Sequence, residues 1–130
     1  MTQEEKDLLL KDLCGRLPYS PILNILGVTG YDEKFISINR VFAHSKYTII
    51  TNSFENPYNP HEFDIEEVRP YLRPLSSMTE EEEIEWFESV VPTMDCDKQL
   101  DFYCKYHFDY RGLIEKGLAI EAPEGMYNFE

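Results

Sequence analysis

Positive charge is scarce in this chain. Its 130 residues include 12 Lys and Arg against 25 Asp and Glu, a formal net charge of −13. Binding to nucleic-acid phosphates requires clustered Lys and Arg that displace counterions, and the sequence has no such cluster. The same shortage disfavours docking on anionic membranes. We therefore expect neither nucleic acid nor a membrane among the direct partners.

Long apolar runs and paired cysteines are missing as well. No run approaches the roughly 20 apolar residues that span a bilayer, and the polar, acidic start of the chain is unlike a secretory leader. Three widely spaced cysteines (Cys14, Cys96 and Cys104) do not form the even-numbered set typical of secreted disulfide frameworks. We expect reduced thiols that fill the core, in a cytoplasmic protein.

The sequence also lacks recognisable cofactor motifs. It has no Gly-rich loop that ends in Lys-Ser or Lys-Thr, no G-x-G-x-x-G and no calcium-binding loop. The three histidines, His44, His61 and His107, are scattered, without the spacing of a zinc site. We expect no metal and no cofactor.

One set of residues could still support catalysis. Asp101, Cys104 and His107 recur at i, i+3 and i+6 of an expected helix, and a Cys–His pair can produce a reactive thiolate. However, side chains on a single helix diverge, whereas a catalytic triad converges. We therefore expect no catalytic residues, and Cys104 is interpreted as a core side chain beside His107.

The composition otherwise predicts a folded α+β protein with one domain over residues 1–130. Hydrophobic residues make up 42% of the chain, enough for a core at this length. A capping box at Thr2 and Glu5 opens an expected helix over residues 2–17. Leu9, Leu13 and Leu17 form its apolar stripe, with Leu10 and Cys14 beside it, while Asp12 falls outside it.

Residues 21–52 favour β-structure. Residues 22–28, 35–39 and 47–51 are rich in β-forming residues, and turn-forming residues such as Asp32 and Glu33 separate the first two runs. Alternation in the second run puts Ile36 and Ile38 on one face. We expect an antiparallel meander, as part of a small sheet of three to five strands.

The second half of the chain predicts two helices and a structured tail. Residues 53–62 form a loop, residues 64–68 are one helical turn or a fourth strand, and Pro70 and Pro74 interrupt the next segment. Thr79 and Glu82 form a second capping box, which opens a helix that ends at Pro92. Its expected buried side chains are Ile84, Trp86, Phe87, Val90 and Val91. A last helix spans residues 95–107, with Leu100, Tyr103 and Cys104 inward.

The negative charge is concentrated in the middle of the chain. Residues 61–100 contain twelve Asp and Glu but only Arg69, Arg73 and Lys98. Six glutamates lie on the expected second helix: Glu80, Glu81, Glu82, Glu83, Glu85 and Glu88. They are either a solvated helix face with a favourable first turn or a surface that binds a basic partner. We select these six as the candidate partner-binding residues.

Three segments, residues 2–19, 65–79 and 107–127, together resemble a family of small uncharacterised proteins encoded by phages, prophages and mobile elements of gut bacteria. The resemblance does not extend to residues 20–60, and it brings no known catalytic or binding residue. It implies a setting in the host bacterial cytoplasm and in phage–host conflict. Within the second segment, Pro70 to Pro74 is interpreted as a rigid join that Tyr71 and Leu72 anchor in the core.

These observations favour a non-enzymatic acidic interaction protein that binds and inhibits a basic host protein, such as a nucleic-acid-handling or defence enzyme. Three alternatives stay open. One is a protein that binds a small ligand or a signal nucleotide, which would need convergent Arg and Lys. Another is a structural or assembly protein of the phage or element, and the third is an enzyme that uses Cys104 and His107.

Overall fold

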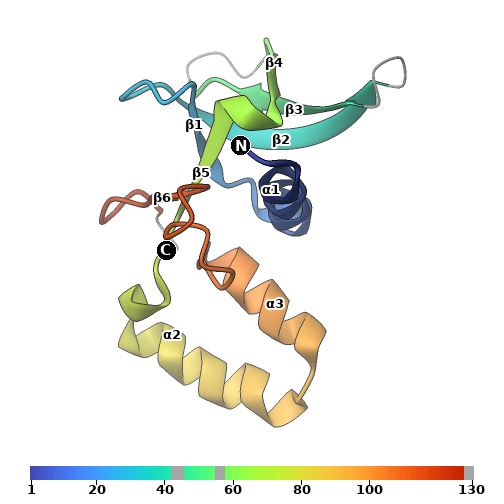
Figure 1. Ribbon diagram of the computed structural model, residues 1–130. Coiled ribbons are helices and arrows are strands. Elements are labelled where there is room, and N and C mark those ends of the chain that lie inside the picture. Colours follow the sequence, from blue (N-terminus) through green and yellow to red (C-terminus); the bar gives the residue numbers. More distant parts are fainter. Residues whose placement is uncertain (42–45, 55–57, 128–130) are drawn as a thin grey trace.

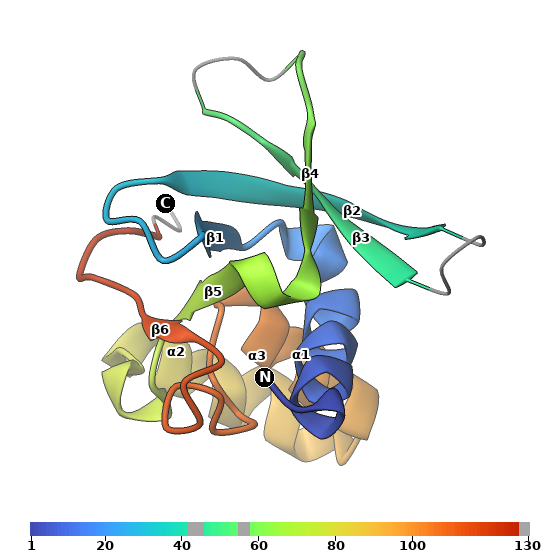
Figure 2. The same ribbon diagram turned by 45° about the horizontal axis from the view of Figure 1, so that its top comes forward.

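The structure, a computed structural model, describes residues 1–41, 46–54 and 58–127. They form a six-stranded sheet, a helix packed on one of its faces and two further helices that extend away from it (Figures 1 and 2). The α+β prediction is confirmed. The sheet is larger than the predicted three to five strands, and it is mixed, because its last strand runs parallel to its neighbour.

The elements follow in a simple order along the chain. The helices are α1 (Gln3–Arg16), α2 (Glu80–Glu85) and α3 (Cys96–Lys105). The strands are β1 (Ile22–Ile25), β2 (Asp32–Val41), β3 (Lys46–Asn52), β4 (His61–Asp64), β5 (Val68–Leu72) and β6 (Ile120–Glu121). Their order across the sheet is β4-β3-β2-β1-β5-β6.

Helix α1 confirms the capping box. The Glu5 amide donates to Thr2 Oγ1 at 3.1 Å, and the Thr2 amide donates to Glu5 Oε1 at 2.9 Å. Leu9 and Leu13 are buried against the sheet, as their spacing predicted. The prediction was wrong at Asp12, which is fully buried because two arginines pair with it.

The meander of β1, β2 and β3 is confirmed as antiparallel, but its details differ from the prediction. Asp32 and Glu33 begin β2 instead of forming a turn. The chain turns earlier, at Leu26 and Gly27, which both have positive φ. A bulge between Phe35 and Ser37 then changes which side chains of β2 point toward the core. As a result Phe35 and Ile38, three residues apart, both contact the core.

Strand β5 contains Pro70 and was not predicted. The Leu26 amide donates to the Glu67 carbonyl at 2.7 Å, so these two residues form a hydrogen-bonded pair. Bonded and non-bonded pairs alternate in an antiparallel ladder, which makes Leu23 and Pro70 a non-bonded pair. The nitrogen of Pro70 therefore faces away from β1, and pairing with β6 begins only at Tyr71. Although proline has no N–H group, no backbone hydrogen bond of the sheet is lost at this position. Tyr71 and Leu72 are buried as predicted, but as part of the sheet.

The C-terminal tail returns to the sheet and adds the edge strand β6. Between the ends of β1 and β5, the Tyr127 hydroxyl accepts from the Ile22 amide at 3.0 Å and donates to the Tyr71 carbonyl at 2.7 Å. Its ring stacks on His107, with centroids 3.9 Å apart. The structured tail was thus correctly predicted, and it contributes both a strand and this bridge.

The described residues form two separate hydrophobic cores. We call α1, the sheet and the tail the sheet body, and residues 80–105 the helical hairpin. Twelve buried residues, mostly aliphatic, form the core of the sheet body. The second core contains Val90, Phe102 and Phe108, with Trp86 among the partly buried side chains packed against them. No helix among the described ranges is long and apolar enough to cross a bilayer.

A buried ionic cluster joins the two regions. Asp12 accepts from Arg16 at 2.7 Å and from Arg111 at 3.1 Å. Arg16, also fully buried, donates to the carbonyl of Phe108 at 2.6 Å. Because Phe108 belongs to the second core, this bond ties α1 to the base of the helical hairpin.

Candidate functional site

The six candidate glutamates occupy different environments around α2. Glu80, Glu81, Glu83 and Glu88 are exposed, and no ion pair joins them to another described residue. Glu85 is half-buried, with a carboxylate oxygen 3.5 Å from Lys105 Nζ. The expectation of six solvent-facing carboxylates is wrong for Glu82, which is only 7% exposed.

Glu82 fixes the start of α2. Its carboxylate accepts two hydrogen bonds from Arg73, at 2.7 and 2.8 Å, and one from the Thr79 amide at 2.9 Å. Burial favours a higher pKa for Glu82, but the Arg73 and Thr79 bonds outweigh it and hold its pKa below the ordinary value. The predicted capping box is confirmed, with an ion pair added to it.

Arg73 connects α2 to the end of β5. Its guanidinium also donates to the carbonyl of Ser77 at 3.0 Å and lies 4.5 Å from the centroid of the Phe108 ring. The backbone of Arg73 continues β5 by pairing with the segment around Phe108. Nothing in the sequence pointed to Arg73, because Glu82 and Phe108 belong to other elements further along the chain.

The helix continues past α2 as a π turn (Trp86–Val90) and a 3₁₀ turn (Val91–Thr93). Trp86 and Val90 pack inward, as predicted. Ile84, Phe87 and Val91 were predicted to be buried, and this is wrong: they are 55%, 66% and 43% exposed. The prediction failed because the described residues that pack against this helix cover one side of it, at Glu82, Trp86 and Val90. The outer face is left both acidic and apolar.

Helix α3 shows the same one-sided burial. Phe102 and Cys104 are buried, and Tyr103 is half-buried and stacks on Trp86. Leu100, which was predicted to point inward, is 42% exposed. Cys14 and Cys96 are also exposed, so the core-filling expectation is correct only for Cys104, although all three thiols are free.

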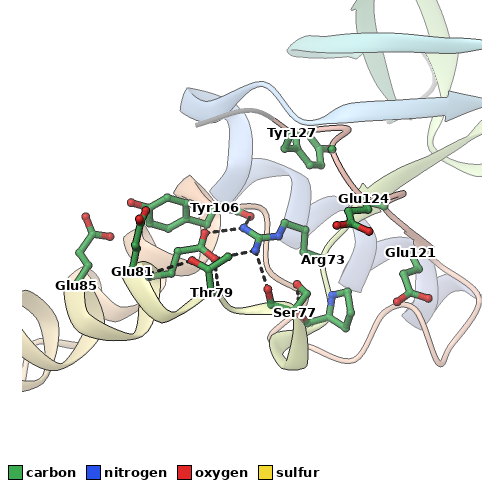
Figure 3. A pocket seen from close by; sticks show the side chains of 13 residues that line it. Arg73, Ser77, Thr79, Glu81, Glu85, Tyr106, Glu121, Glu124 and Tyr127 are labelled. Carbon is green, nitrogen blue, oxygen red and sulfur yellow. Dashed lines mark hydrogen bonds and ion pairs between the residues drawn. The ribbon is translucent and has the colours of Figure 1, made fainter. Parts of the chain in front are cut away.

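A pocket of about 700 Å³ lies beside the N-terminal end of α2 (Figure 3). Arg73, held by Glu82, lines it together with Tyr106 and Tyr127. The other charged lining residues are Glu81, Glu85, Glu121 and Glu124. A phosphate ligand needs convergent Arg or Lys, and the single arginine in this lining is already engaged. The pocket therefore gives no support to a signal-nucleotide site.

A second pocket, of about 410 Å³, lies at one end of the sheet. Its lining residues include Tyr31, Asp32, Glu33 and Phe54, but no Lys or Arg. Glu33 is buried there and accepts from Thr51 at 2.6 Å, while His61 Nδ1 lies 2.8 Å from both of its carboxylate oxygens. These polar contacts satisfy a carboxylate inside the sheet.

The residues considered for catalysis have separate partners. Asp101 is exposed and accepts a hydrogen bond from Tyr19, a bond that raises the Tyr19 pKa to about 12. Burial raises the pKa of the Cys104 thiol and so disfavours the thiolate. Burial, together with the charges of Arg16 and Arg73, lowers the pKa of His107 to about 4.

Metal binding finds no support among the residues described. They contain no group of three or more His, Cys, Asp or Glu side chains placed to hold a metal ion. His61 is engaged with Glu33, and His107 is buried against Tyr127. His44 lies outside the described residues.

Comparison of the chain with protein-family models, with curated proteins and with solved structures found no match.

Proposed function

We propose that this chain is a non-enzymatic interaction protein of a phage or mobile element, which binds a basic host protein in the bacterial cytoplasm and inhibits it. A nucleic-acid-handling or defence enzyme is the expected kind of target. The proposal comes from the sequence, including its family resemblance, and from the charge on the outer face of α2.

The observation that carries the proposal is an acidic face without counter-charges. Glu80, Glu81, Glu83 and Glu88 are exposed, and residues 74–97 contain no Lys or Arg. The neighbouring Glu82 and Arg73 neutralise each other below this face. A positively charged partner surface would be attracted to it, which raises the association rate at low salt and lowers it at high salt.

The inhibition would result from occupancy of a basic surface that the host protein needs for its own ligand. Nucleic-acid-handling enzymes expose such surfaces, because phosphate binding requires Lys and Arg. Exposed carboxylates can compete for them without carrying out any chemistry. Burial raises the pKa of the Cys104 thiol, which disfavours the alternative of an enzyme that uses Cys104 and His107.

Affinity capture from bacterial lysate, at low and at high salt, tests the proposal. The variant Glu80→Gln/Glu83→Gln/Glu88→Gln should lose the captured protein, whereas Glu4→Gln/Glu62→Gln/Glu115→Gln should keep it. Both variants lose three negative charges at exposed positions, so the control separates a local site from overall charge. Equal loss in both variants, or capture that high salt does not weaken, would count against the proposed docking.

A further inference from the structure

The acidic face of α2 also contains a row of apolar side chains. Ile84 lies on α2, Phe87 on the π turn that follows it and Val91 at the start of the 3₁₀ turn, and all three are exposed. They lie opposite Trp86 and Val90, which pack inward. Met94, which follows the 3₁₀ turn, is 87% exposed. Single exposed apolar residues are common on protein surfaces, whereas several on one side of a helical segment are the pattern by which amphipathic helices enter grooves on their partners.

The charges around these apolar side chains indicate which kind of partner could bind them. Glu80, Glu83 and Glu88 are exposed on the same short helix, which has no Lys or Arg. A second copy of the chain would place glutamates against glutamates, and an anionic membrane would repel them. An apolar groove with Lys and Arg along its rim complements both features.

We infer that the continuous helical segment 80–93, which is α2 with its π and 3₁₀ turns, docks into such a groove on the basic host protein, with Ile84, Phe87 and Val91 as its anchors. This inference rests on the proposed function and specifies its binding mode. The glutamates accelerate the encounter, and the apolar anchors slow dissociation, because desolvated side chains at the centre of an interface carry most of the binding energy.

The helix is already ordered for this role. On its inner side Trp86 packs on Phe102, with ring centroids 5.2 Å apart, and Val90 belongs to the same core. The Arg73–Glu82 pair holds its N-terminal end. A partner would therefore bind a helix that is already formed. The conformational entropy of ordering this helix is lost when the protein folds, so it does not weaken binding.

Site-specific crosslinking identifies what occupies this face. A Phe87→p-benzoylphenylalanine variant should crosslink in host lysate to one basic protein, at a peptide with apolar residues and flanking Lys or Arg. The same photoprobe at the exposed Glu115 should not produce this product. Crosslinks between two copies of the chain, or to lipid, would overturn the inference.

Binding measurements with the crosslinked protein, once purified, separate the inference from the proposed function. Ile84→Ala/Phe87→Ala should raise Kd by roughly 30-fold or more, mainly through faster dissociation. The control Leu26→Ala/Val28→Ala removes two exposed apolar side chains from the β1–β2 turn and should leave Kd unchanged.

The outcomes are distinguishable. If the glutamine variant weakens binding and Ile84→Ala/Phe87→Ala does not, the groove is wrong while the acidic docking stands. If Ile84→Ala/Phe87→Ala weakens binding and the glutamine variant has no effect, the basic partner is wrong, and the inference falls with the proposed function. If position 87 yields no specific product, both fail.

Discussion

The sheet body and the helical hairpin use their apolar residues differently. In the sheet body, α1 covers one face of the sheet, and twelve buried side chains form a continuous core. In the hairpin, Val90 and Phe102 form a small core with Phe108, while Ile84, Phe87 and Val91 are exposed. Two helices packed on each other bury one line of side chains each. The first region thus buries most of the apolar core, and the second leaves apolar side chains exposed.

The junction between the regions offers the largest expected effect. Asp12→Ala would leave the buried guanidinium of Arg16 without its carboxylate and would remove a partner of Arg111. Breaking a buried pair in this way costs about 3–5 kcal/mol of unfolding free energy. Urea denaturation measures the loss. Asp7→Asn, an exposed change on the same helix, should shift it by less than about 0.5 kcal/mol. A small effect of Asp12→Ala would mean that the two regions are not coupled through this cluster.

Acid should also weaken the junction, through His107. Its pKa is about 4 in the folded protein, against about 6.5 for an unperturbed side chain. As pH falls from 6.5 towards 4, the unfolded chain therefore takes up a proton that the folded chain does not, and stability falls by on the order of 3 kcal/mol.

Denaturation curves between pH 7 and pH 4 for wild type and His107→Asn test this expectation. Asn tolerates the positive φ of 60° at this position. The variant should lose this part of the pH dependence. Identical slopes for the two proteins would assign the acid sensitivity to other groups.

A smaller effect, confined to the hairpin, is expected at Glu82. Glu82→Gln removes the charge partner of Arg73 at the start of α2, at a cost of about 1.5–3 kcal/mol. Amide hydrogen exchange should accelerate in α2 and α3 and stay slow in β1, β2 and β3. The neighbouring exposed Glu83→Gln serves as the control and should change neither region. Equal acceleration in the sheet would show that the two regions open together.

The smallest effect is expected on the outer face of the hairpin. Ile84→Ala/Phe87→Ala removes apolar side chains that are more than half exposed, so the free energy of unfolding should change by less than about 0.5 kcal/mol for each residue. Leu13→Ala in the sheet body should cost about 2–5 kcal/mol. Thermal denaturation distinguishes the two cases. A strongly destabilised Ile84→Ala/Phe87→Ala protein would mean that these side chains support the fold.

Local signals in the sequence were sufficient to find the two helix starts that have capping boxes, and the meander. The capping boxes at Thr2 and Thr79 depend on residues three positions apart, so the sequence predicts them directly. The β-rich runs likewise identified β1, β2 and β3, although the bulge after Phe35 changed which residues share a face. Strand β5 was missed because Pro70 is acceptable there only in relation to β1 and β6.

The sequence alone determined the amount of negative charge, its concentration in residues 61–100 and the α+β composition, because these depend on residue type and near neighbours. Only the tertiary structure decided which charged and apolar side chains are covered. Asp12 became buried where Arg111, 99 residues along the chain, reached it beside Arg16, and Glu82 became buried where Arg73 at the end of β5 folded back on α2. Ile84 and Phe87 remained exposed because, in the part of the chain that the structure describes, no segment packs over them. Burial depends on which surfaces meet in space, and residues far apart in the chain supply those surfaces.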